Sequence, residues 1–147
     1  MPLDTPLNTT LSIRNQLPGT VTAVTPGEVM AAVKVLLDGG QELTSAITLE
    51  AVRALGLAAG SAVRALVKST EVALATAAVD GVSVRNQLPG TVREIATGGA
   101  MASVKVTVPG AELTSVITKT AADDLALAPG TAVVALIKST EVSLATA

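Results

Sequence analysis

Several residue types are missing from this chain of 147 residues, which contains no histidine, no cysteine, and no phenylalanine, tyrosine or tryptophan. Without histidine and cysteine, the chain cannot build thiolate or imidazole metal sites, disulfides, or a cysteine or serine–histidine nucleophile. Without aromatic rings, it lacks the platforms on which proteins stack single-stranded nucleic acid. These absences exclude several classes of enzyme and the main device for binding single strands.

The net charge and the lengths of the apolar runs disfavour further classes of protein. The net charge is −2 and the pI is near 5.0, which is not the electrostatic footprint of a nucleic-acid-binding protein. No stretch approaches the roughly 18 uninterrupted apolar residues of a membrane span. The opening MPLDTPLNTTLS has neither the cationic nor the apolar region of a signal peptide. We therefore expect a cytoplasmic protein with no nucleic-acid partner and no membrane partner.

The hydrophobic content predicts an unusual core. Apolar residues make up 49% of the chain, but with no aromatic residue the core has to be built from Val, Leu, Ile, Ala and Met. Such a core buries little area per residue, and small domains are already short of buried surface. Oligomerisation is the usual remedy, so we expect the functional unit to contain several chains.

The chain is a tandem duplication. IRNQLPGTV at residues 13–21 returns as VRNQLPGTV at residues 84–92, an offset of 84 − 13 = 71. After a one-residue deletion, KSTEVALATA at residues 68–77 returns as KSTEVSLATA at residues 138–147, an offset of 138 − 68 = 70. The predicted organisation is an N-terminal extension (1–11), a first unit (12–77), a linker (78–82) and a second unit (83–147).

Each unit is predicted to form five short strands and one short helix. LPGTVTAV predicts a turn that leads into a strand, and VMAAVKVLL, ELTSAIT, AVRALVK and EVALA predict the other four. TLEAVRALGL places Leu49, Val52 and Leu55 at helical spacing, with Thr48 as N-cap and a glycine at the end. This order is that of an OB-like barrel. The predicted fold class is therefore mainly β, with two tandem OB-like five-stranded β-barrels, each with one short helix.

Comparison of the two copies shows which polar residues the duplication retained. The helix surface diverged, since Glu50 and Arg53 became Thr120 and Asp123. The retained polar pairs are Ser12/Ser83, Arg14/Arg85, Asn15/Asn86, Gln16/Gln87, Thr20/Thr91, Thr44/Thr114, Ser45/Ser115, Thr48/Thr118, Lys68/Lys138, Ser69/Ser139, Thr70/Thr140 and Glu71/Glu141.

The retained set consists mainly of hydrogen-bond donors. Hydroxyls, amides, an ammonium and a guanidinium all donate, and charge-assisted bonds from such groups suit a small tetrahedral oxyanion. Carboxylates are nearly absent from the set, so calcium or magnesium would be poorly served. The pattern predicts one anion site per repeat.

Each motif also has a plainer interpretation. RNQLPGT is typical of a turn in which Asn caps and Pro-Gly bends the chain, and LTSAIT is typical of a half-exposed strand with hydroxyls facing water. A Lys-Ser-Thr turn between strands is more often solvated than liganded, and it lacks the glycine of a phosphate loop, where Val67 and Ile137 stand instead. Glu71 and Glu141 are then explained by pairing with a nearby Lys or Arg.

In combination, SIRNQLPGTV, ELTSAIT and ALVKSTEVALA resemble the Mop domain of the molbindin family, which comprises small cytoplasmic proteins that bind molybdate and tungstate. The same domain occurs in molybdate-responsive regulators and in molybdate importer ATPases. The resemblance covers nearly the whole chain beyond residue 11, twice, and two units in tandem resemble the di-Mop type. It implies a molybdate or tungstate ligand, no covalent cofactor, and six Mop domains per particle, which this chain would reach as a homotrimer.

The resemblance also implies where the oxyanion binds. Family sites lie between domains, with S-x-R from one domain and a Thr after the third strand plus the K-S pair from its neighbour. A further family ligand, a Ser three residues after that Thr, is replaced here by Ala51 and Ala121. The implied ligand residues are Ser12, Arg14, Thr48, Lys68, Ser69, Ser83, Arg85, Thr118, Lys138 and Ser139. Weaker candidates, for a second class of site on a symmetry axis, are Thr44, Ser45, Thr114 and Ser115.

The function we expect is intracellular molybdate binding for storage and homeostasis, without catalysis and without a metal ion bound directly by protein atoms. Lys68 and Arg14 would offset the charge of the dianion while hydroxyls and backbone N–H groups satisfy its oxygens. The alternative is a molybdate-sensing interaction module that acts on a protein partner. An enzyme is disfavoured because no histidine, cysteine or retained carboxylate pair is present for general acid–base chemistry.

Overall fold

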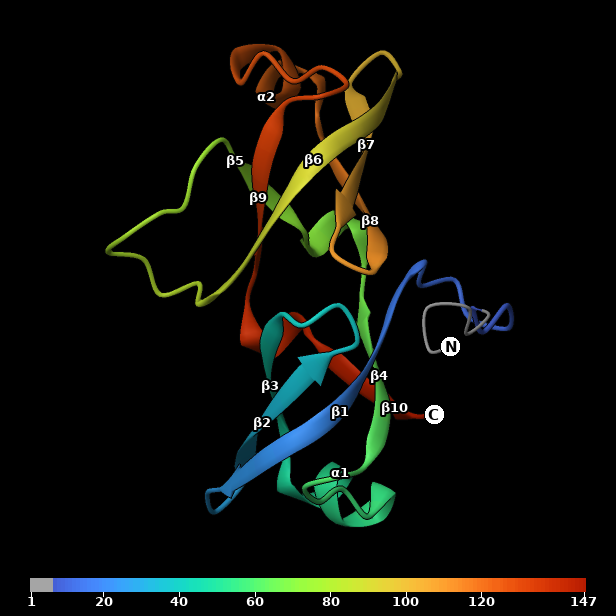
Figure 1. Cartoon of the computed structure of the whole chain (residues 1–147), viewed down its shortest axis with the longest axis vertical. Helices are drawn as coiled ribbons and strands as arrows, with labels where there is room; N and C mark the ends of the chain where they lie inside the picture. Colours follow the sequence, from blue (N-terminus) through green and yellow to red (C-terminus); the bar gives the residue numbers. More distant parts are fainter. Residues whose placement is uncertain (1–6) are drawn as a thin grey trace.

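The computed structural model describes residues 7–147 and contains two five-stranded sheets stacked end to end (Figure 1). The first sheet has the strand order β10-β4-β1-β2-β3 and the second the order β5-β9-β6-β7-β8. The elements of the first repeat are β1 (Asn15–Pro26), β2 (Met30–Leu37), β3 (Glu42–Thr48), α1 (Leu49–Leu55), β4 (Ala62–Val67), the 3₁₀ turn η2 (Ser69–Glu71) and β5 (Ala73–Ala75). Those of the second are β6 (Asn86–Thr97), β7 (Met101–Val108), β8 (Ala111–Thr118), α2 (Lys119–Asp124), β9 (Ala132–Ile137), η3 (Ser139–Glu141) and β10 (Ser143–Thr146).

The predicted fold class is confirmed, since the chain is mainly β with two five-stranded curled sheets and one short helix beside each. The alternation in VMAAVKVLL forms β2 as expected, with Val33, Val35 and Leu37 buried on one face. Period-two burial of this kind pins the register of a strand, because a slip of one residue would turn its apolar face to solvent.

The helix prediction is confirmed at both of its ends. Thr48 caps α1 by accepting a hydrogen bond from the N–H of Ala51 at 3.1 Å, and Thr118 caps α2 in the same way through Ala121. α1 ends at Gly56, whose φ of 63° is left-handed, as is common one residue beyond a helix. The two helices lie at opposite ends of the molecule (Figure 1).

The predicted turn at LPGT is wrong, because these residues lie inside the long strands β1 and β6. Pro18 pairs with Arg64 of β4, but pairing with β2 begins only at the next residue, so the missing proline N–H falls where β1 has one neighbour. Gly19 then allows β2 to approach closely: a Cβ there would lie 2.7 Å from the carbonyl oxygen of Leu36. Proline and glycine therefore mark a strand crossing rather than a turn.

Each sheet takes its fifth strand from the other repeat. β10, at the C-terminus, pairs antiparallel with β4 of the first repeat, and β5 pairs with β9 of the second. The red C-terminal strand accordingly lies with the blue and cyan strands in the lower half of Figure 1, whereas the green strand β5 lies in the upper half. The contiguous sequence units 12–77 and 83–147 thus exchange their last strands.

One hydrophobic cluster runs through both halves. It includes Val63 and Leu43 from the first repeat together with Val142 and Leu144, which the second repeat contributes through the exchange. As predicted, the core consists of aliphatic residues, but the expected contribution of methionine is wrong for the described residues. Met30 and Met101 are each 44% exposed, because they begin β2 and β7 at the ends of the molecule. None of the helices in residues 7–147 is long and apolar enough to cross a membrane.

Candidate functional site

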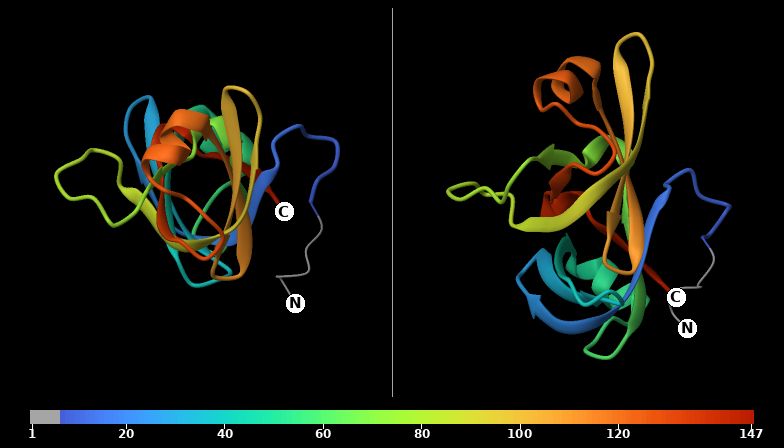
Figure 2. Two further views of the ribbon diagram at one scale, coloured as in Figure 1. Left: turned by 90° about the horizontal axis from the view of Figure 1, so that it is seen from above. Right: turned by 45° about the horizontal axis from the view of Figure 1, so that its top comes forward.

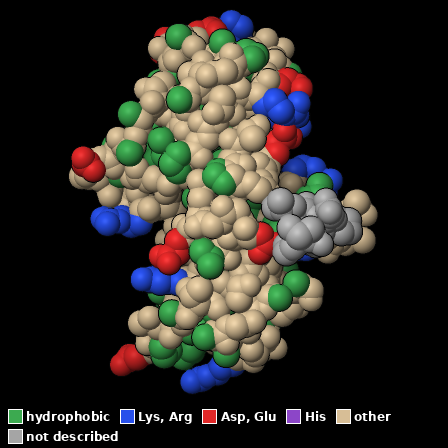
Figure 3. Space-filling model, viewed as in Figure 1, with side chains coloured by type: hydrophobic (Ala, Val, Ile, Leu, Met, Phe, Trp, Pro, Cys, Tyr) green, Lys and Arg blue, Asp and Glu red, His purple; other side chains and the backbone are tan. Residues whose placement is uncertain are grey.

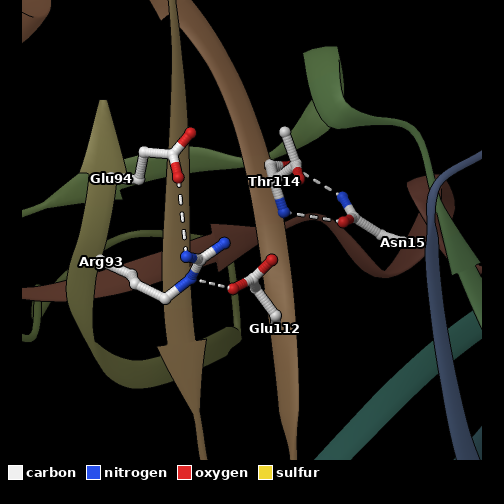
Figure 4. Close-up of polar contacts among 5 residues, drawn as sticks. All are labelled: Asn15, Arg93, Glu94, Glu112 and Thr114. Carbon is white, nitrogen blue, oxygen red and sulfur yellow. Dashed lines mark hydrogen bonds and ion pairs between the residues drawn. The ribbon is translucent and has the colours of Figure 1, made fainter. Parts of the chain in front are cut away.

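The retained asparagines join the two repeats. The side chain of Asn15 donates to the carbonyl of Thr114 at 2.8 Å and accepts from its N–H at 2.8 Å (Figure 4). Asn86 makes the same pair with Thr44, at 2.8 and 2.9 Å. Both asparagines are buried, so each amide acts as one rung of a β-ladder between the start of one long strand and the third strand of the other repeat.

The retained glutamines hold the loops that precede the two arginines. Gln16 accepts from the N–H of Asn8 at 2.6 Å and donates to the carbonyl of the same residue at 2.9 Å. Gln87 does the same with Val79, at 3.0 and 2.8 Å. Residues 8–12 are therefore held like the linker that leads to residue 83, and Figure 2 shows both as loops standing out from the body.

Ser45 and Ser115 are fully buried and serve the strand exchange. Ser45 donates its hydroxyl to the carbonyl of Val142, and Ser115 donates to Val72, each at 2.6 Å. Their acceptors precede the exchanged strands β10 and β5. These two weaker candidates thus have a structural role that the sequence interpretation did not give them.

Arg14 lies beside the second repeat. It lines a hollow of about 390 Å³ together with Thr114 and Lys105, and its guanidinium donates to the carbonyl of Leu11. The structure therefore brings one predicted ligand, Arg14, to the weaker candidate Thr114 of the other repeat. Ser12, two residues before Arg14, is exposed on the same loop.

Lys68 follows the end of β4, and Lys138 follows the end of β9. β4 and β9 pair with the first residues of the long strands β1 and β6. Asn15 pairs with Val67, so Arg14 and Lys68 leave the same end of the β1–β4 ladder. In the second repeat, Lys138 and Val84 line a common hollow of about 320 Å³. Both lysines are exposed, and Ser69 and Ser139, which begin the 3₁₀ turns after them, are half-buried.

Ser139 is also tied to the repeat junction, because its Oγ lies 3.5 Å from Nδ2 of Asn86, the neighbour of Arg85. Two of the three predicted ligand segments, S-x-R and K-S, therefore lie close together beside Asn15 and again beside Asn86. We call these two places, where each asparagine contacts the other repeat, the repeat junctions.

The third predicted segment lies elsewhere in the same chain. Thr48 ends β3, four residues after Thr44, which at the usual rise per residue is about 13 Å further along the strand. It lines a separate hollow of about 450 Å³ with Val29 and Arg53. A single copy of the chain thus does not bring Thr48 or Thr118 to Arg14 or Arg85.

On the face drawn in Figure 3, positive and negative side chains are interspersed. Arg93 pairs with Glu112 and lies 3.5 Å from Glu94 (Figure 4). The hydrogen bond to Glu112 and the charges of both carboxylates raise the pKa of Arg93. Within residues 7–147 the only other ion pair is Lys119–Asp123, so the explanation of Glu71 and Glu141 as ion-pair partners is wrong there.

Sequence reasoning identified Asn15, Asn86, Gln16 and Gln87 as retained but assigned them to a donor set for an anion. Their side chains instead make backbone contacts across the repeat junction and within the loops. The signal that could have separated them was the chemistry of the carboxamide, which presents a donor and an acceptor together and so mimics a peptide group.

Comparison with known proteins agrees with the duplicated architecture. A family model described as the TOBE domain matches the chain twice, over residues 11–74 and 82–144. The structure of ModG, a cytoplasmic molybdate-binding protein solved with molybdate bound, is similar with a TM-score of 0.89 and 44% sequence identity. The match covers 93% of this chain and 99% of ModG.

Two curated relatives match over most of the chain. The molybdenum-pterin-binding protein MopA of Rhodobacter capsulatus is 40% identical over 136 residues, which are 91% of this chain and 51% of MopA. The molybdenum transport protein ModE of Azotobacter vinelandii is 40% identical over 135 residues, 91% of this chain and 50% of ModE. The chain therefore spans about half the length of these relatives.

Proposed function

The chain belongs to the TOBE-domain family, with two Mop-type units in tandem, and from this premise we propose that it binds molybdate. The main support for the proposal is a pair of cationic clusters, one in each repeat. The exposed Arg14 and Lys68 leave the same end of the β1–β4 ladder, and the exposed Arg85 and Lys138 leave the same end of the β6–β9 ladder. The similarity to ModG, which was solved with molybdate bound, supports the choice of anion.

The proposed recognition is purely non-covalent. Arg14 and Lys68, with Arg85 and Lys138 in the second repeat, offset the charge of the dianion, and the hydroxyls of Ser12, Ser69, Ser83 and Ser139 donate to its oxygens. An ionised ligand that leaves water is costly unless it is paired and fully hydrogen-bonded, so several donors have to converge on it. Tungstate has the same charge and shape as molybdate and should bind as well, whereas the smaller sulfate would leave some donors too far away.

Completion of the site by a second copy of the chain is also part of the proposal. Thr48 and Thr118 are implied ligands. Each, however, lies about 13 Å along its strand from Thr44 or Thr114, the residues that contact Asn86 and Asn15. The surface beside Thr48 exposes two large apolar side chains, Met30 at 44% and Val29 at 71%. The charged residues Glu28, Glu50 and Arg53 line the same hollow as Thr48 and Val29. We propose that another copy covers this surface and receives Thr48 into its own junction site, in a homotrimer that contains six Mop units.

Native mass spectrometry tests binding and assembly together. We expect a trimer that gains several molybdate or tungstate ions and no sulfate when each is added in excess. Because a ligand that binds only the assembled state stabilises it, molybdate should also shift a diluted sample toward the trimer. A particle that ignores molybdate would contradict the proposed function.

Isothermal titration of a double variant tests the predicted ligands. Lys68→Ala with Lys138→Ala removes one charged donor from each junction, which should cost on the order of 1.5–3 kcal/mol per site, or about ten- to a hundredfold in Kd. Thr70→Ala with Thr140→Ala alters the same 3₁₀ turns at exposed residues outside the predicted ligand set and serves as the control. Unchanged affinity and stoichiometry in the lysine variant would remove both lysines from the site.

For the cell, we propose that binding serves storage and homeostasis of molybdenum in the cytoplasm. The similarity to ModE favours a second candidate, a molybdate-sensing module that acts on a protein partner, because the chain matches about half of that longer protein. Pull-downs from molybdate-replete and molybdate-depleted extracts separate the two. Storage predicts no partner that depends on the anion, and sensing predicts one.

A further inference from the structure

The loops that precede Arg14 and Arg85 have the same frame but differ in charge. In both, a glutamine side chain clamps the backbone eight residues upstream, Gln16 on Asn8 and Gln87 on Val79. The residue after the clamped position is Thr9 in the first loop and Asp80 in the second, at the repeat offset of 80 − 9 = 71. One loop therefore carries a carboxylate where its counterpart carries a hydroxyl.

Asp80 shares a hollow with the arginine of its loop. Asp80, Arg85 and Gln87 line a space of about 290 Å³ together with residues 79, 81 and 82 of the linker. Arg14 lines its hollow with Lys105 and Glu112 of the second repeat, and it donates to the carbonyl of Leu11 in its own loop. Among the described residues, the loop of Arg85 thus supplies a carboxylate of its own to the hollow, and the loop of Arg14 does not.

Two charged residues in the hollow of Arg14 have counterparts of the same charge in the first repeat. Lys105 corresponds to Lys34, and Glu112 corresponds to Glu42. Arg93 and Glu94 stand where the first repeat has Thr22 and Ala23, but these two opposite charges lie 3.5 Å apart and cancel each other. Arg64, whose Nη1 donates to Oε1 of Gln16 in the first loop at 3.3 Å, has the uncharged counterpart Val134. Among the described residues, Asp80 beside Arg85 and Arg64 beside the loop of Arg14 are therefore charges that one junction has and the other lacks, and both favour an anion at Arg14 over one at Arg85.

We propose that the two arginine-bearing loops bind oxyanions with unequal affinity and that Asp80 weakens the Arg85 site. The inference rests on the proposed function, since it concerns the strength of the same sites. A carboxylate beside a bound dianion repels it and also competes for the guanidinium. Both residues are exposed, so the effect is of the size of surface charge interactions, about two- to fivefold in Kd, and it shrinks as salt is added.

Isothermal titration with sodium molybdate at low salt tests the inference on the full chain. The wild type should show two affinity classes for the junction sites, and Arg85→Ala should abolish the weaker one. Asp80→Asn, which keeps the shape of the side chain but removes its charge, should tighten that class about two- to fivefold, and Asp80→Glu should leave it weak. The reciprocal variant Thr9→Asp should weaken the tighter class by a similar factor.

The outcomes separate this inference from the proposed function. Two classes that move closer together in Asp80→Asn but stay apart in Asp80→Glu support it. Molybdate binding with affinities that neither Asp80→Asn nor Thr9→Asp changes would overturn the inference and leave the proposed function standing. Absence of molybdate binding by the wild type would overturn both.

Discussion

Ser45 donates its buried hydroxyl to the main-chain carbonyl of Val142 across 97 positions of sequence, with an Oγ–O distance of 2.6 Å. Ser115 repeats the contact with Val72, also at 2.6 Å. Each acceptor leads into a strand that completes the sheet of the other repeat. The two serines therefore fasten the exchanged segments to the sheets that receive them.

Replacement of both serines by alanine should destabilise the fold. Each substitution removes a buried hydrogen bond and leaves a carbonyl without that donor, at a cost of about 1–3 kcal/mol per site. The two contacts share no partner, so the effects should be close to additive. Urea unfolding of Ser45→Ala, Ser115→Ala and the double variant measures this. Ser143→Ala is the matched control, because Ser143 is exposed and the first repeat already has alanine at that position, Ala73. Equal stability of the double variant and the control would contradict the fastening role.

Removal of the C-terminal strand should loosen the N-terminal half of the molecule. A chain that ends after Val142 loses β10 and with it Leu144, a buried side chain worth about 2–3 kcal/mol. β4 then becomes an edge strand, while β9 keeps β5 as its neighbour. Hydrogen exchange should show lost protection in residues 62–67 and retained protection in residues 132–137. The opposite pattern would mean that the strands are not exchanged in solution.

The elements that the sequence predicted well are those whose signals are local. The helix in the first repeat follows from the spacing of Leu49, Val52 and Leu55, the Thr48 cap and the glycine that ends it, all within nine residues. The strand β2 follows from alternation alone. Such features depend on neighbours in sequence, so a single chain without relatives suffices to find them.

The strand exchange could not be predicted, because the duplication makes its alternatives nearly identical. The segments 68–77 and 138–147 differ only at Ala73 and Ser143, so either segment offers the same side chains to β4 and to β9. The choice between them depends on how the chain crosses from one half to the other, which no local pattern records. The roles of the retained polar residues could not be predicted for the same reason. Retention of Asn15 in both copies is consistent with a ligand or with a structural contact, and only its contact with Thr114 decides between them.

The mistaken turn at LPGT leads to a prediction about packing. Gly19 and Gly90 lie where a Cβ would approach a carbonyl oxygen of the neighbouring strand to 2.7 and 2.6 Å. Backbone atoms cannot yield as a flexible side chain can, so Gly19→Ala and Gly90→Ala should each cost about 1–3 kcal/mol, the usual range for overpacking. Gly99→Ala is the control, because nothing lies within 4 Å of its Cβ. Thermal unfolding that gives all three variants the same midpoint would contradict the close crossing of the strands.

The ends of the two helices give a reciprocal prediction. Gly56 follows α1 with a left-handed φ of 63°, and the duplication placed Ala126 at the equivalent position with a φ of 51°. An L-residue in this region is strained by roughly 1–2 kcal/mol, whereas glycine is not, although glycine loses more entropy on folding. Ala126→Gly should therefore stabilise the protein by about 0.5–1 kcal/mol, and Gly56→Ala should destabilise it by about 1 kcal/mol. Chemical denaturation of both variants measures the pair, and Ala54→Gly, inside α1, is expected to destabilise because its backbone is helical. If Ala126→Gly destabilised the protein as Ala54→Gly does, the left-handed conformation at residue 126 would be contradicted.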